Sequence, residues 1–591
     1  MFTPLSNFPE IDHLIPLFAQ IDLDLTIILV VAGILIIALV TALAPKVGVA
    51  GPLVLVALGI GITLIPGTPN LYLPPDWILI GILPPLLYAA AVSLPAMEFR
   101  RDFSAIGGLS VLLVLLSSLV LGLVFSLLIP DVGFAVGVAL GAVLSPTDAV
   151  ATSIVKKLGT SPRVVTMLEG ESLLNDATAL VLLKTAIAAA AAPFALWGSI
   201  GTFSWAVVIA VGIGGIVGWV NLRVRAWIPS TTAATAISFV VPYVAYLPSE
   251  HLGGSGLVAA VVAGIVTGQG AARYFTAEQR LSDRVNWRTI ELMLEGAVFL
   301  IMGLELSSVI NSGDEDILGN AAFLALLAFL VIMGMRTLYV IPLVWLQGRR
   351  AKRGETIRPH LEQARDRFQN VTVEQVAERG ARNPERRLAS FRRRISRSLG
   401  DIAYLESSQL GWREGTLIVW AGMRGAVTLA AAQTLPQDTP NRSLLILIAF
   451  LVAVGTLLVQ GSTIKPLIRA LGLTGARDDA DYAERLAELN ASLREAASKA
   501  LANPDLHRED GRPFDPELLA AARERMVAPP NEAEGATMDE LRAIRLVIIQ
   551  AQRQRLTSAR SNGRYSTAML RRVLEGLDAE ELSIRAHLPE G

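Results

Sequence analysis

The chain has 591 residues, of which 52% are hydrophobic and only 17% are charged. This composition is too apolar for a soluble enzyme of the same length and predicts many membrane spans. The chain contains no cysteine, which excludes disulfides and thiolate metal sites. The formal net charge of −1 says nothing about partners, and no nucleic acid is expected among them.

The first residues, MFTPLSNFPEIDHL, are acidic and lack the positive start of a secretory signal. We therefore expect residues 1–21 to be an extracellular N-terminal segment that is not cleaved. Thirteen apolar stretches follow, each of about the 20 residues that a spanning helix needs. They cover residues 22–43, 47–65, 76–94, 103–129, 132–154, 169–192, 201–221, 231–247, 252–269, 288–309, 317–346, 412–434 and 443–469.

Basic residues indicate which ends of these spans face the cytoplasm, because Lys and Arg accumulate on that side of a membrane. With the N-terminus outside, the inner connections carry the basic residues, for example Arg100, Lys156 and Arg273. The outer connections carry almost none, Arg442 being the exception. We expect a multi-pass protein of the cell membrane with its N-terminus outside and its C-terminus in the cytoplasm.

Two charged regions interrupt or follow the spans. Residues 22–347 hold the first eleven spans and residues 412–470 the last two, so residues 348–411 form a basic insertion between them. Residues 471–591 form a charged tail with a helical pattern, and the alternation of the spans places both regions in the cytoplasm. The expected fold is all-α, a polytopic membrane protein of thirteen helices with a helical cytoplasmic tail.

Spans 5 and 12 contain helix-breaking residues beside a charge. Span 5 carries GAVLSPTDAVA and span 12 carries WAGMRGAVTLAAA. Unpaired backbone is tolerated at this depth only inside protein or beside a watery cavity. If spans 1–6 and 8–13 are two inverted six-helix repeats, the two breaks occupy matching positions, which is typical of a transporter site. Gly and Pro are common in membrane helices, so either break alone would carry less weight.

Five ionisable residues are the candidates for charges buried in mid-membrane: Asp148, Glu171, Asp176, Arg336 and Arg424. A charge at the bilayer centre costs about 2.5–3.5 kcal/mol on insertion scales, so it needs a partner or a function. A structural ion-pair network is one interpretation of this set. A transport site is the other, and it is the default for ionisable groups inside a membrane.

Helical spacing separates the two acids of span 6. Residues four apart share a face, so Ser172 lies beside Asp176, whereas Glu171 lies about 140° away on the face of Asn175. Arg336 stands isolated in the apolar sequence of span 11 and needs an acid, which we assign to Glu171.

Asp176 is then left facing a cavity. Its carboxylate can hold a proton or a small hard cation, which prefers oxygen ligands. Ser172, Thr147, Asp148 and the carbonyls of the broken helix would complete the shell. Competition between cation and proton at one carboxylate is sufficient for exchange. Two further acids, Glu291 and Glu295, share a face near the cytoplasmic end of span 10 and are expected to meet water.

Five stretches resemble motifs of the monovalent cation:proton antiporter family that includes the sodium/proton exchangers. GESLLNDATALVL is similar to the Asn-Asp motif, LSPTDAVA to the unwound helix and GMRGAVTLA to the second crossing segment. GILPPLLYAAA and WRTIELMLEGAVFLIMGLEL also fit, and all five stand in the family's order. The resemblance covers residues 22–470, so the tail and much of the insertion lie outside its scope.

The resemblance implies a thirteen-span fold with a mobile core domain and a dimerisation domain, and hence a homodimer. By position it makes Asp176 the site of the cation and the proton, with Asn175 and Asp148 beside it. It gives the other charges supporting roles: Glu171 and Arg336 as an ion pair, and Arg424 within the crossing segment.

The expected function is exchange of Na⁺, or of K⁺ or Li⁺, for H⁺ by alternating access, in the service of pH homeostasis. One proton or one cation neutralises Asp176, while Asn175 cannot titrate and Glu171 is committed to Arg336. Exchange is therefore expected to be electroneutral, as the resemblance to Asn-Asp members also implies. The alternative is a cation channel or uptake route through the same broken helices, although no filter-like repeat is present.

Other functions find less support in the sequence. No Ser-His-acid, HExxH or P-loop arrangement is present, so we expect no enzymatic activity and no cofactor besides the transported ions. The insertion and the tail are expected to regulate transport rather than carry it out. Basic segments on the inner side attract anionic membrane lipid, although the insertion could equally be a topological anchor with no switching role.

Overall fold

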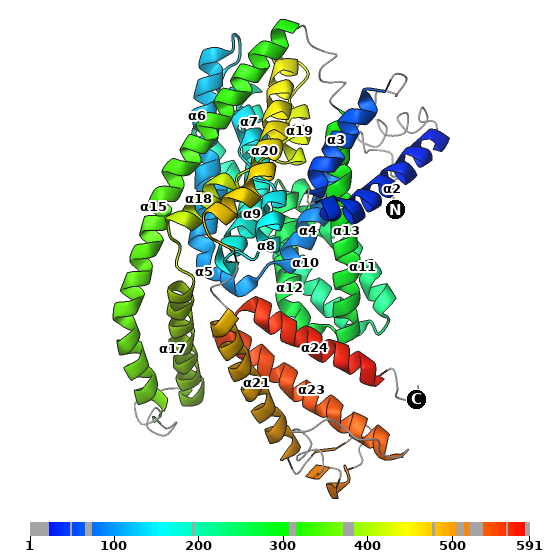
Figure 1. Ribbon diagram of the computed structural model, residues 1–591, viewed down its shortest axis with the longest axis vertical. Coiled ribbons are helices and arrows are strands. Elements are labelled where there is room, and N and C mark those ends of the chain that lie inside the picture. Colours follow the sequence, from blue (N-terminus) through cyan, green and yellow to red (C-terminus); the bar gives the residue numbers. More distant parts are fainter. Residues whose placement is uncertain are drawn as a thin grey trace, which may run out of the picture.

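The computed structural model describes most of the chain, and the named elements of those parts are all helices (Figure 1). It describes residues 23–47, 50–65, 74–191, 196–305, 315–369, 383–474, 479–503, 536–562 and 565–585, with a few isolated positions between 371 and 520. The expected extracellular segment, residues 1–21, lies outside the described residues.

Among the residues that the structure describes, eight helical stretches are long and apolar enough to cross a membrane. They are α2 (Leu23–Val47), the continuous run of α5 (Ala96–Gly107), η2 (Gly108–Leu112) and α6 (Leu113–Leu128), then α9 (Pro162–Ala191), α10 (Leu196–Trp227), α11 (Thr231–His251), α12 (Gly256–Tyr274), α15 (Glu315–Gln369) and α20 (Arg442–Ala470). Each coincides with one expected span.

The five other expected spans coincide with shorter, broken or more charged helices. They are α3 (Gly51–Thr63), the π-helical turn η1 (Trp77–Ile82) with α4 (Leu83–Ser93), α7 (Phe134–Leu144) with α8 (Ala149–Lys157), α13 (Ala277–Leu304), and α18 (Trp412–Trp420) with α19 (Ala426–Gln433). Pro84 and Pro85 stand where η1 gives way to α4, because neither can donate the backbone hydrogen bond of a regular helix.

Helix caps set several boundaries that apolar patterning placed elsewhere. α12 begins at Gly256 rather than at residue 252, because Gly253 has a φ of +73° and Ser255 accepts from the Val258 N–H. α13 begins eleven residues before the expected span, after a capping box in which Thr276 and Gln279 satisfy one another's backbone N–H groups.

The membrane helices form two groups that pack mainly within themselves. The first, which we call the broken-helix bundle, contains α5 to α9, η2, α15, α18, α19 and α20. The second, the companion bundle, contains α2, α3, α4 and α10 to α13. Glycine permits close crossings in each: a Cβ on Gly137 would lie 2.6 Å from the Gly122 oxygen, and one on Gly59 would lie 2.7 Å from the Leu300 oxygen.

α15 runs 55 residues and continues well past the expected end of its span into the basic insertion (Figure 1). Arg, Lys, Ala, Glu and Gln predominate after Gln347, and α15 continues there through Gly348, Gly354 and Pro359. α17 (Pro384–Ser407) packs back against it. Tyr404 of α17 donates to Asp102 at 2.9 Å, and burial beside that carboxylate raises the pKa of Tyr404, which keeps the phenol a neutral donor.

The tail helices have an apolar core of their own. α21 (Asp479–Leu501), α23 (Ala536–Asn562) and α24 (Thr567–Arg585) bury Leu489, Leu493, Ile549, Leu556 and Met569 among themselves. Figure 1 shows them at the lower end of the molecule, with α24 below α12 and α13. α24 packs against α13 and α5, so the tail is docked on the membrane helices.

Candidate functional site

The two broken helices meet at their breaks. α7 ends at Leu144 and α8 begins at Ala149, while α18 ends at Trp420 and α19 begins at Ala426. The Asp148 N–H donates to the Met423 oxygen at 2.8 Å and so joins the two unwound segments directly. A Cβ on Gly425 would lie 2.8 Å from Asp148 Cγ, so only glycine allows the segments to approach this closely.

Two charges of opposite sign lie at the helix ends formed by the breaks. Arg424 is 2% exposed, and its Nε donates to the Leu144 oxygen at 2.5 Å, while Nη1 donates to the Gly422 oxygen. A cation is favourable there because carbonyls at a helix C-terminus carry partial negative charge. Asp148 is the residue before α8, where free N–H groups favour a negative charge. The unwound backbone is thereby compensated without an external ion.

The inward face of α9 carries a buried ion pair. Arg336 Nη2 donates to Glu171 Oε2 at 2.8 Å, and Nη1 donates to Oε1 of the same carboxylate. The side chains of Arg336 and Glu171 are only 2% and 1% exposed, so each charge is compensated chiefly by the other. Arg336 Nε also donates to the Ile418 oxygen at 2.9 Å, which ties α15 to α18.

Thr147 and Asn175 join this pair rather than the open cavity. Asn175 Nδ2 donates to Thr147 Oγ1 at 2.6 Å, and Thr147 in turn donates to Glu171 Oε1 at 3.3 Å. Both side chains are buried. The chain of hydrogen bonds fixes α9 relative to the break between α7 and α8.

Asp176 lies on the opposite face of α9 and lines a cavity of about 1350 Å³. Ser172, one turn earlier, and Asp148 line the same cavity. Asp176 is half-buried, and it makes no hydrogen bond or ion pair with any residue that the structure describes. The arrangement therefore leaves one carboxylate of α9 available to a ligand and engages the other with arginine.

The opposite wall of the cavity comes from the companion bundle. α4, α12 and α13 contribute, and among the charged residues of α13 are Glu291 and Glu295. The sequence placed these two acids on one face near water, and helical spacing was the signal. It did not show that this face opens on the cavity of Asp176, because that depends on how the bundles pack.

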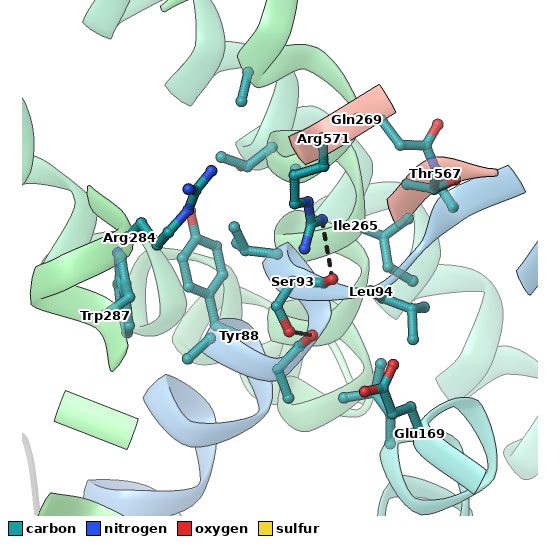
Figure 2. A pocket seen from close by; sticks show the side chains of 18 of the residues that line it. Tyr88, Ser93, Leu94, Glu169, Ile265, Gln269, Arg284, Trp287, Thr567 and Arg571 are labelled. Carbon is teal, nitrogen blue, oxygen red and sulfur yellow. Dashed lines mark hydrogen bonds between the residues drawn. The ribbon is translucent and has the colours of Figure 1, made fainter. Parts of the chain in front are cut away.

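The mouth of the cavity is covered by the tail, which sequence patterns did not predict. Figure 2 shows Arg571 and Thr567 of α24 above Ser93, with Arg284, Trp287 and Glu169 around them. Arg571 donates to the Ser93 oxygen at 3.0 Å. Burial lowers the pKa of the Arg571 guanidinium, and the neighbouring Arg284 lowers it further. Two guanidinium groups, those of Arg571 and Arg284, therefore line the mouth of the cavity.

Buried contacts hold the tail in this position. Arg280 of α13 donates to both oxygens of Asp578, with an Nε–Oδ2 distance of 2.8 Å. The carboxylate of Glu98, in the first turn of α5, accepts from the Thr567 N–H at 2.6 Å. These contacts join residues that are about 300 and 470 positions apart in the sequence, so no local sequence pattern could predict them.

Comparisons with known proteins agree on one family. Residues 33–470 match the model of the sodium/hydrogen exchanger transmembrane family. An uncharacterised Na⁺/H⁺ exchanger of Mycobacterium tuberculosis is 26% identical over 578 residues, covering 94% of this chain and 96% of that protein. The Na⁺/H⁺ antiporter NhaH of Halobacillus aidingensis is 27% identical over 398 residues, covering 66% of this chain and 82% of its own length.

A solved structure shows the same fold. The sodium proton antiporter MjNhaP1 of Methanocaldococcus jannaschii superposes with a TM-score of 0.53 at 16% sequence identity. The match covers 77% of this chain and all of that one.

Proposed function

Because the chain belongs to the sodium/hydrogen exchanger family, we propose that it exchanges Na⁺ for H⁺ across the cell membrane by alternating access, with Asp176 as the carboxylate that holds either ion. The observation that carries this proposal is that, in the described part of the chain, one of the two acids of α9 is ion-paired and the other is not. Glu171 is saturated by Arg336, whereas Asp176 faces the cavity without a partner in the described structure.

The cation site consists of oxygen ligands on one wall of the cavity. Asp176 supplies the charge, and Ser172 and Asp148 supply further oxygens from the same wall. The sequence placed Asn175 and Thr147 beside the cation. In this proposal they are not ligands, and their hydrogen bonds hold α9 against the break between α7 and α8. Arg424 neutralises the partial negative charge of the carbonyls at the end of α7, so the unwound segment is stable without a bound ion.

Exchange follows from competition. A proton on Asp176 removes the charge that attracts the cation, and a bound cation excludes the proton. The broken-helix bundle carries Asp176 and moves against the companion bundle, which contacts it at few places. One cation or one proton neutralises one carboxylate, so the cycle is electroneutral with a ratio of one to one.

The wider architecture belongs to the same proposal. All thirteen helical units cross the membrane as two inverted six-helix repeats, the N-terminus lies outside, and the tail and insertion lie in the cytoplasm. The protein works as a homodimer and contributes to pH homeostasis. K⁺ or Li⁺ replaces Na⁺ where its size fits the same oxygens.

The test is transport in vesicles that contain the purified protein. An outward gradient of Na⁺, K⁺ or Li⁺, each in turn, should drive proton uptake, and the rate should not change when valinomycin and K⁺ impose a membrane voltage on Na⁺ exchange. A current carried by an ion gradient alone, with no proton movement, would establish the channel instead. A rate that changes with voltage would show that more than one proton moves per cation.

A further inference from the structure

One face of α13 presents charge to the cation cavity along its length. Arg284, Arg288, Glu291 and Glu295 stand at spacings of four, three and four residues, which places them on one side of a helix. All four line the cavity. The basic pair lies nearer the start of α13 and the tail, and the acidic pair lies deeper.

Glu295 is the deepest member of this stripe. Its neighbours in sequence pack into protein: a Cβ on Gly296 would lie 2.5 Å from Ile37, and Val298 and Phe299 are buried. Glu295 itself is half-buried and makes no hydrogen bond or ion pair with the residues that the structure describes. An acid this far into a membrane bundle without a partner is costly, which argues for a function.

The charges that act on Glu295 come from the opposite wall and from its own helix. They are Asp148 at the break, Lys157 at the end of α8, and Glu291 one turn earlier. Two of the three are acidic, so the charges around Glu295 do not neutralise it. Glu295 lines the same cavity as Asp176, but the two acids belong to different bundles.

We propose that Glu295 is a specificity-determining residue that raises the affinity of the cavity for the transported cation without being a transported charge. This inference rests on the function proposed above. The carboxylate attracts a cation across the cavity toward Asp176 and holds it at the level of the binding site. A low-dielectric wall strengthens this attraction relative to open water.

Its place in the companion bundle separates Glu295 from the charge that moves. α13 packs closely on α3, since a Cβ on Gly303 would lie 2.4 Å from the Val56 oxygen. α13 also packs on α2 and α4, whereas Asp176 belongs to the broken-helix bundle. When the two bundles move against each other, Glu295 stays behind. Its charge alters cation affinity on the side where the cavity opens and leaves the one-to-one ratio unchanged.

The experiment compares cation dependence in variants of α13. Na⁺-driven proton flux is measured in vesicles over a range of Na⁺ on the tail side, for the wild type, Glu295→Gln and Glu295→Asp. Glu278→Gln is the matched control, because Glu278 is an exposed acid in the first turn of the same helix. Asp176→Asn is assayed in parallel to test the underlying function separately.

The expected result is a change in KM rather than in maximal rate. Glu295→Gln should raise the KM for Na⁺ by about three- to tenfold, as expected for a unit charge acting across a partly screened cavity. The maximal rate should stay within about twofold by the same reasoning, because Asp176 is intact. Glu295→Asp keeps the charge and should restore most of the affinity. Glu278→Gln should match the wild type.

Three outcomes would overturn the inference. An unchanged KM in Glu295→Gln would show that the acid is merely hydrated. Loss of maximal rate in protein that still elutes as a folded species would place Glu295 inside the exchange cycle. A new voltage dependence in Glu295→Gln would show that its charge is transported. If Glu295→Gln does not fold, Glu295→Asp and Glu295→Asn provide the same comparison at a shorter side-chain length.

The control with Asp176 keeps the two proposals distinguishable. An active Asp176→Asn variant would refute the proposed exchange site whatever Glu295 does. An inactive Asp176→Asn variant together with an unchanged KM in Glu295→Gln would refute only the role of Glu295.

Discussion

At the scale of the residue, the pairing of Glu171 with Arg336 holds the site together. Both side chains are almost fully buried, and Arg336 also donates a hydrogen bond to the carbonyl oxygen of Ile418. A buried pair of this kind is weak evidence for stability as a whole, but the loss of one partner leaves a charge without compensation. The pair is therefore expected to matter most when it is broken on one side.

Glu171→Ala or Arg336→Ala should each lower the stability of the protein by about 3–5 kcal/mol. The double change Glu171→Gln with Arg336→Gln should cost less than the sum of the two single losses, because no lone charge remains. The free energy of unfolding of each variant is measured in detergent, with heat or denaturant used to unfold the protein. Strict additivity would count against the pairing as the source of the effect.

The sequence predicted the pair of Glu171 and Arg336, but not the hydrogen bonds that surround it. Spacing along α9 separated Glu171 from Asp176, and the isolation of Arg336 in apolar sequence supplied the partner that the structure shows. Thr147 was expected to help complete the cation shell, and in the structure its hydroxyl accepts from Asn175 and donates to Glu171. The direction of a side chain in unwound backbone depends on dihedral angles that helical periodicity cannot supply.

At the scale of the element, the tail is a docked unit. α24 covers the cavity mouth, and its buried contacts with α13 and α5 involve Asp578 and Thr567. Hydrophobic periodicity predicted a helical tail but not its place, since docking rests on single polar contacts between distant segments. Two arginines, Arg560 and Arg571, line the mouth, and their positive charges would repel an entering cation.

Deletion of residues 478–591 should leave exchange intact and change its cation or pH response. With the positive charges gone from the mouth, we expect a KM for the cation that is about two- to fivefold lower, in line with the removal of partly screened charges. Asp578→Asn, which weakens the contact with Arg280, should change KM in the same direction by a smaller factor. Complete loss of exchange in a correctly inserted truncation would show that the tail belongs to the transport machinery.

At the scale of the whole molecule, two bundles enclose one cavity, and the tail marks the side on which it opens. Composition alone predicted a polytopic helical protein, and eight helices of spanning length bear this out. The arrangement of the bundles did not follow from the sequence, because it is set by close helix crossings at glycines such as Gly59 and Gly137. The basic residues predict which side of the membrane each connection faces.

The absence of native cysteine makes this orientation directly testable. Asp438→Cys, between α19 and α20, should react with a membrane-impermeant maleimide in intact cells. Ser390→Cys, exposed on α17, should react only after the membrane is permeabilised. The reverse pattern of labelling would invert the orientation and, with it, the side on which the cavity opens.

The central claim is that one carboxylate, Asp176, holds either the cation or the proton. Asp176→Asn keeps the size of the side chain and removes both its charge and its titration, and Asp438→Asn makes the same chemical change at an exposed position. The most direct measurement is cation-driven proton flux in vesicles that contain equal amounts of each folded protein. The account predicts that Asp438→Asn exchanges like the wild type and that the flux of Asp176→Asn falls by at least about a hundredfold, since the carboxylate that binds the cation and the proton in turn is gone. Flux near the wild-type rate in folded Asp176→Asn protein would contradict it.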